Sequence, residues 1–106
     1  MRHSSLICTL LATSLSFCAP QAAPAPSTIA IKNFNFSPAT QDVTVGSTVT
    51  WHNDDGEPHT VVGIAGSFRS AALDTGESFA FKFTKAGVYK YICSIHPRMT
   101  GTITVK

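Results

Sequence analysis

The chain has 106 residues, 13% of them charged, and a formal net charge of +2 at pH 7. This length leaves room for one small domain, and the weak charge without a basic stripe excludes a nucleic-acid-binding protein. No apolar run reaches the roughly 20 residues that a membrane-spanning helix requires, so we expect no stable insertion into a membrane.

Residues 1–25 have the features of a cleavable export signal that ends in an Ala/Pro-rich junction. Arg2 supplies a positive charge, an apolar stretch runs from Leu6 to Phe17, and small residues follow it. We therefore predict export to the periplasm and a single domain over residues 26–106. An uncleaved anchor and a lipid anchor on Cys18 are the alternatives, and the large residue before Cys18 disfavours the second.

From Ser27 onward, apolar and polar residues alternate with a period of two, which is typical of half-buried β-strands. β-Branched and aromatic residues are frequent, and turn signals containing Gly or Pro separate the stretches. This pattern predicts an all-β fold, an antiparallel sandwich or barrel. The alternating residues expected on the inward faces are Ile29, Ile31, Val43, Val45, Val49, Trp51, Asn53, Phe79, Phe81, Phe83, Tyr89, Tyr91, Cys93, Ile103 and Val105.

Cys93 is the one cysteine within residues 26–106, because Cys8 and Cys18 lie in the export signal. Exported proteins meet an oxidising compartment, where cysteines usually pair. A single exported cysteine therefore indicates an intermolecular disulfide, a reactive thiol, a metal thiolate or a buried inert side chain. The residues around Cys93 favour the metal.

The segment 93–99 reads CSIHPRM, and a second histidine, His59, lies upstream. Cys93 has inward parity at the end of its predicted strand, and the proline in the segment prevents the strand from continuing. One loop then presents Cys93, His96 and Met99 to a single point, while His59 comes from a neighbouring strand. A thiolate, two imidazoles and a weak axial thioether are the ligands of a type 1 copper site.

Zinc is the alternative metal, but structural zinc sites usually contain two or more cysteines and no methionine. Taken singly, His59 fits an ordinary strand-edge histidine, His96 a surface residue and Met99 a core filler. Their joint spacing around an unpaired cysteine is what predicts copper.

The chain resembles the cupredoxins, most closely the amicyanin branch of the plastocyanin-like group. The similarity runs from about Ile29 to Val105, and its most specific part is the short Cys-x-x-His-x-x-Met loop. The segments 36–38, 45–53, 58–59 and 83–91 also carry it. The resemblance implies an eight-stranded Greek-key β-sandwich and copper ligation by His59, Cys93, His96 and, weakly, Met99.

The resemblance also implies a soluble periplasmic electron carrier, expected as a monomer. Its partners would be redox proteins of the dehydrogenase or cytochrome type that dock near His96, whose ring edge is expected to reach solvent. Ile95 and Arg98 stand where amicyanin-type loops have proline and phenylalanine. These two departures bear on the redox potential and on the choice of partner.

Three residues are expected to act around the ligands. Asn53 has inward parity although it is polar, and we predict that it hydrogen-bonds the backbone near Ser94 and so joins the two halves of the site. The amide of Ile95 is expected to donate a hydrogen bond to the Cys93 sulfur. The acidic turn 54–57 is expected to be only solvated.

Electron transfer is the leading function, and copper delivery through the same site is the alternative. An oxidase or nitrite reductase would need a second copper centre, for which residues 26–106 hold too few histidines. A thiol hydrolase built on Cys93 and His96 lacks a marked orienting residue. We therefore expect that the chain is not an enzyme.

Overall fold

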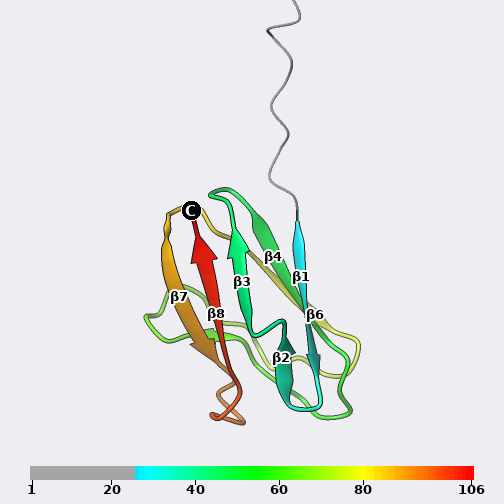
Figure 1. Ribbon diagram of the computed structural model, residues 1–106. Helices are drawn as coiled ribbons and strands as arrows, with labels where there is room; N and C mark the ends of the chain where they lie inside the picture. The colour runs from blue at the N-terminus through cyan, green and yellow to red at the C-terminus, as the bar shows by residue number, and fades with distance from the viewer. Residues whose placement is uncertain (1–25) are drawn as a thin grey trace, which may run out of the picture.

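The computed structural model describes residues 26–106, so the predicted export signal, with Cys8 and Cys18, lies outside the described residues. Eight strands run through the described part of the chain (Figure 1). In chain order they are β1 (Ser27–Lys32), β2 (Asn35–Ser37), β3 (Thr40–Val43), β4 (Thr48–Asn53), β5 (Val62–Gly63), β6 (Ser78–Lys82), β7 (Gly87–Ile92) and β8 (Thr100–Val105).

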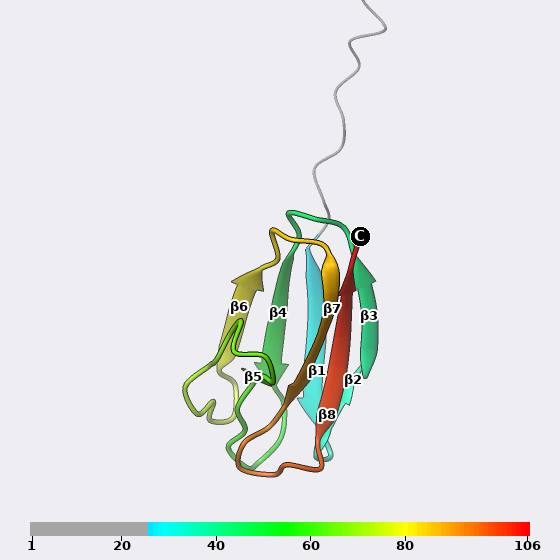
Figure 2. The same ribbon diagram turned by 90° about the vertical axis from the view of Figure 1, so that its left-hand side faces the viewer.

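The strands form two four-stranded sheets, with orders β2-β1-β4-β6 and β3-β8-β7-β5, that pack face to face as a sandwich (Figure 2). The all-β sandwich predicted from the sequence is therefore confirmed. The pairs β1–β4 and β3–β8 are parallel, whereas the other four pairs are antiparallel. A period-two pattern reports which face is buried and carries no information on strand direction, so these two parallel pairs could not be anticipated.

The space between the sheets is filled largely by the residues that the alternation predicts. Trp51 from one sheet meets Tyr91 from the other edge to face, with ring centroids 5.4 Å apart. Val45 is the exception, since 44% of it is exposed. The strand β3 ends at Val43, and the amide of Ser47 donates to the carbonyl of Thr44, so Val45 lies at the corner of a turn.

One end of the sandwich gathers the β1–β2 turn, the β4–β5 connection and the β7–β8 loop, while the C-terminus lies at the other end (Figures 1 and 2). The predicted ligands come from two of these three segments. Over residues 26–106, the structure contains no helix long and apolar enough to cross a membrane.

Candidate metal centre

The loop after β7 folds back on itself and thereby fixes the directions of its side chains. The amide of Cys93 donates to the carbonyl of Met99 at 3.1 Å, and the amide of Met99 donates to the carbonyl of His96 at 2.9 Å. Met99 is buried as part of the hydrophobic core, next to the last turn of the loop. These bonds close a seven-residue loop in which Cys93, His96 and Met99 all start from a constrained backbone.

His59 reaches the site from the connection between β4 and β5. Its backbone forms an isolated bridge with Leu73, in which the two residues exchange amide-to-carbonyl hydrogen bonds of 3.1 and 2.7 Å. The residue is thus held like a strand residue, although no strand is formed there. Its side chain is fully buried, so its ring has little freedom to turn.

The three predicted strong ligands converge. One donor atom from each of His59, Cys93 and His96 lies within 4.8 Å of the other two. The Cys93 Sγ is 3.8 Å from Nδ1 of His59 and 3.8 Å from Nδ1 of His96. Metal bonds of about 2.3 Å to sulfur and about 2.0 Å to nitrogen, at a trigonal angle, hold such atoms about 3.8 Å apart. The spacing of the donors therefore fits one ion in a trigonal His₂Cys arrangement.

The chemistry of the thiol fits a metal as well. Burial by itself raises the pKa of Cys93, but hydrogen bonds from the amides of Thr60 and His96 and from the imidazoles of His59 and His96 outweigh this effect. Together they lower the pKa of Cys93 from 9.0 to about 6. Because the thiolate is the metal-binding form, the site holds its sulfur ready at neutral pH.

We expect the metal-free protein to lose its thiolate signal with a midpoint near pH 6. Since the pKa is lower in the folded state, the thiolate stabilises the metal-free fold fully above pH 9.0, and this contribution is lost as the pH falls through about 6. Thiolate absorbance in the ultraviolet, recorded against pH with Cys93→Ser as the background, measures the midpoint. A midpoint at the ordinary value of 9.0 would contradict the assignment.

Thr60, which the sequence analysis did not single out, joins the two halves of the site. Its amide donates to the Cys93 Sγ at 3.3 Å, the role that the sequence predicted for the amide of Ile95. Its hydroxyl oxygen accepts a hydrogen bond from the amide of Ser94 at 2.7 Å and lies 2.8 Å from the Ser94 hydroxyl. Thr60, which follows His59, is thus hydrogen-bonded to Ser94, which follows Cys93.

Asn53 is fully buried as its parity predicts, but its partners differ from those expected. Its amide nitrogen donates to the carbonyls of Glu57 and Leu73, both at 2.8 Å, and its oxygen accepts from the amide of Asp55. The predicted bond to the backbone near Ser94 is therefore wrong. Asn53 instead ties the connection after β4 to the segment that bridges His59, because these carbonyls lie nearer to the end of its strand.

The expectation that the acidic turn 54–57 is only solvated is wrong for Asp55, which belongs to the site. Its carboxylate accepts hydrogen bonds from the amides of Asn33 and Phe34, at 2.7 and 2.9 Å, and lies 2.9 Å from Nε2 of His59. Burial raises the pKa of Asp55, but these three donors outweigh it and the pKa is lowered overall. An ionised acceptor at Nε2 keeps the proton there and leaves Nδ1 of His59 free to bind a metal.

We expect Asp55→Asn to weaken copper binding about 10- to 100-fold, the usual consequence of losing an outer-sphere partner of a metal-ligating histidine. The amide can no longer act as an anionic acceptor for the Nε2 proton. Asp54→Asn is the matched control, because Asp54 lies next in the chain and pairs with the exposed His52 rather than with the site. Competition titration of copper against a chelator measures both affinities, and equal affinities for the two variants would contradict the role of Asp55.

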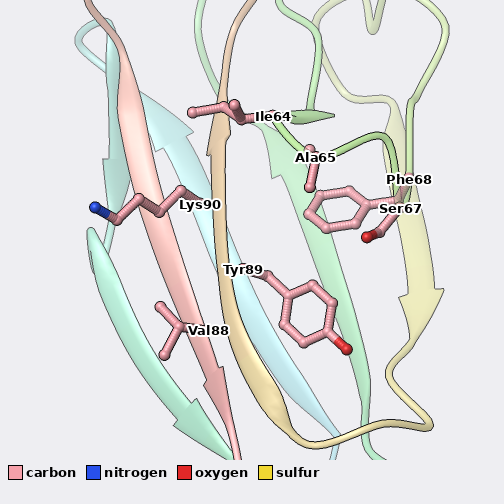
Figure 3. A pocket seen from close by; sticks show the side chains of 8 residues that line it. Ile64, Ala65, Ser67, Phe68, Val88, Tyr89 and Lys90 are labelled. Atoms are coloured by element: carbon pink, nitrogen blue, oxygen red, sulfur yellow. The ribbon is translucent and has the colours of Figure 1, made fainter.

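A groove of about 410 Å³ lies elsewhere, along β7 (Figure 3). Phe68 and Tyr89 lie on one side of this strand, whereas Ile64, Val88 and Lys90 lie on the other. None of the four predicted ligands lines the groove. The metal centre is therefore a compact cluster of side chains at one end of the sandwich, separate from this groove.

Comparison with known proteins also indicates a copper-binding protein. A family model described as copper binding proteins, plastocyanin/azurin family, matches residues 25–106. The chain is 34% identical to amicyanin of Paracoccus denitrificans over 95 residues, 85% of this chain and 72% of that protein. It is 37% identical to plastocyanin of Scenedesmus fuscus over 84 residues, 67% of this chain and 86% of that protein.

Solved structures of copper proteins superpose on this chain. A purple cupredoxin from Nitrosopumilus maritimus superposes with a TM-score of 0.71 at 37% identity, over 76% of this chain and 99% of that one. A copper-containing nitrite reductase from Thermus scotoductus gives 0.73 at 34% identity, over 84% of this chain but only 24% of the enzyme. With the donor set described above, these matches identify the cluster as a type 1 copper site.

Proposed function

Because the chain belongs to the plastocyanin/azurin family of copper-binding proteins, we propose that it is a periplasmic electron carrier. We assign the ligands as Nδ1 of His59, the thiolate of Cys93, Nδ1 of His96 and, weakly, the thioether of Met99. When bound, copper supplies one-electron exchange between its cupric and cuprous forms. The convergence of three donors from two separate segments is the observation that supports this function best.

The protein's own contribution is to keep the ligands in place. The buried ring of His59 is held by Asp55 and by its backbone bridge, and Cys93 is held by the amide of Thr60. The closed loop fixes His96 and Met99 relative to Cys93. Ligands held in this way move little when the charge of the site changes, and a small rearrangement is the condition for fast outer-sphere electron transfer.

His96 is the proposed exit for the electron. Unlike His59 and Cys93, it is partly exposed, and the exposed side chains of Phe34 and Ile95 belong to the same end of the molecule. A redox partner protein that docks there would approach the ring of His96 directly. We place this exchange in the periplasm on the strength of the predicted export signal in residues 1–25.

Copper delivery uses the same ligands, but the burial of the site favours the electron carrier. A delivery site has to release its ion, whereas both Cys93 and His59 are fully buried here. Catalysis by this chain alone is also disfavoured, because the matched nitrite reductase is an enzyme of which this chain spans 24%. Within residues 26–106, the structure shows one cluster of three metal-binding side chains.

The test compares two rates on the copper-loaded protein. Line broadening in mixtures of reduced and oxidised protein gives the electron self-exchange rate, and colour loss with excess chelator gives the rate of copper release. An electron carrier is expected to exchange electrons many orders of magnitude faster than it releases copper. A protein that releases copper rapidly and exchanges electrons slowly would instead be a delivery protein.

A further inference from the structure

The turn between β1 and β2 has an unusual backbone. Lys32 pairs with Asn35, so Asn33 and Phe34 form a two-residue hairpin loop, and both have positive φ, 53° and 59°. Such a loop favours Asn followed by Gly. Asparagine tolerates this conformation, but a bulky aromatic residue in it is a true outlier. Strain of this kind persists only where the surroundings enforce it, and it often marks a functional position.

The surroundings that enforce it include the carboxylate of Asp55. One oxygen accepts from the amide of Asn33 at 2.7 Å, and the other accepts from the amide of Phe34 at 2.9 Å. The second oxygen also lies 2.9 Å from Nε2 of His59. One carboxylate thus connects the strained turn to a copper ligand 26 residues further along the chain than Asn33.

The ring of Phe34 is aimed at the metal centre. Its centroid lies 5.4 Å from the ring of His59 and 4.9 Å from the ring of His96, with interplanar angles of 86° and 85°. The two imidazoles are 5.0 Å apart, so one phenyl ring contacts both. The other side of Phe34 faces solvent, since 47% of the residue is exposed.

We propose that Phe34, presented by the turn that Asp55 holds, acts as a positioning residue for the imidazole of His96 and does so while in contact with the imidazole of His59. This inference rests on the proposed function, because it assigns to Phe34 the task of keeping the two histidines at their ligating spacing. His59 is already held by its own backbone bridge, whereas His96 lies on a loop and is partly exposed. Phe34 therefore restricts chiefly the ring of His96, while the ring of His59, which it also contacts, is held by its own backbone.

Phe34→Gly tests the proposal, since glycine adopts positive φ without strain and the substitution removes the whole benzyl side chain. In the metal-free, full-length protein, we expect the ring resonances of His96 to broaden or split in the NMR spectrum, while those of His59 change less. In the loaded protein, we expect copper affinity to fall on the order of 10-fold and self-exchange to slow. Val45→Gly is the matched control, because Val45 is 44% exposed and lies in the turn after β3.

Unchanged imidazole resonances together with a copper affinity within about twofold of wild type would overturn the proposal. Equal losses in Phe34→Gly and Val45→Gly would also overturn it, since the effect would then come from a more flexible chain. The first of these readouts needs no copper. A failure of the proposed function appears differently, as a wild-type protein that forms no coloured copper complex.

Discussion

Cys93→Ser is expected to abolish the intense visible absorption of the copper-loaded protein and to lower its copper affinity by at least about 100-fold, more than the loss of an outer-sphere contact. A serine hydroxyl does not ionise near neutral pH and is a hard donor, whereas the Cys93 thiolate is a soft one that suits Cu(I). The fold should survive, because the substitution changes one atom and leaves the core around it. Visible absorption and chelator competition measure the two effects, and circular dichroism checks the fold.

Met99→Leu is the graded control for this prediction. Leucine conserves the volume of the buried side chain and removes the thioether. Since the thioether is assigned as a weak ligand, the visible band should persist in this variant, with a changed potential. A Cys93→Ser protein that stays coloured, or a Met99→Leu protein that is as colourless as Cys93→Ser, would contradict the assignment of the ligands.

Gly101→Ala is expected to destabilise the protein by about 1–3 kcal/mol or more, the usual range for overpacking a core. Gly101 on β8 pairs with Tyr91 on β7, and a Cβ atom at this position would overlap the Tyr91 ring. The ring cannot move aside easily, because it is fully buried and packs against Phe36 and Trp51. For a domain of this size, each kcal/mol lowers Tm by roughly 4–8 °C.

Gly56→Ala is the matched control for Gly101→Ala. A Cβ atom at Gly56 meets no other atom within 4 Å, and its backbone lies outside the left-handed region. This variant should therefore unfold at about the same temperature as the wild type, or slightly above it. Thermal unfolding of the metal-free proteins, followed by circular dichroism, gives both values. The same Tm for Gly101→Ala and the wild type would contradict the expected overlap between a Cβ atom at position 101 and the Tyr91 ring.

The burial pattern was predictable wherever a strand is regular. Ile29 and Ile31 on β1, and Val49 and Trp51 on β4, face the core as their alternation requires. The predicted burial of Val45 was wrong because the alternation continues past the end of β3 into a turn. The expectation of antiparallel pairing was wrong for β1–β4 and β3–β8. A strand that is buried on one face has the same pattern in parallel and antiparallel pairs.

The convergence of His59, Cys93 and His96 was predictable because three residues of the segment 93–99 have spacing and chemistry that few other sites share. The hydrogen bonds and ring contacts around these three residues were not predictable, since each joins segments that are far apart in the sequence. Thr60 and Ser94 are 34 residues apart, and Phe34 and Asp55 are 21 apart. A metal-ligating histidine needs an acceptor for its second nitrogen, and this rule would have pointed to the carboxylates near His59.

The most direct test of the account is a titration of the purified protein with Cu(II), followed by visible absorption. A copper–thiolate site formed by Cys93 predicts an intense band at about 600 nm that grows linearly and saturates at about one copper ion per chain. A protein that stays colourless when it has been saturated with Cu(II) would contradict the type 1 site and, with it, the proposed electron transfer.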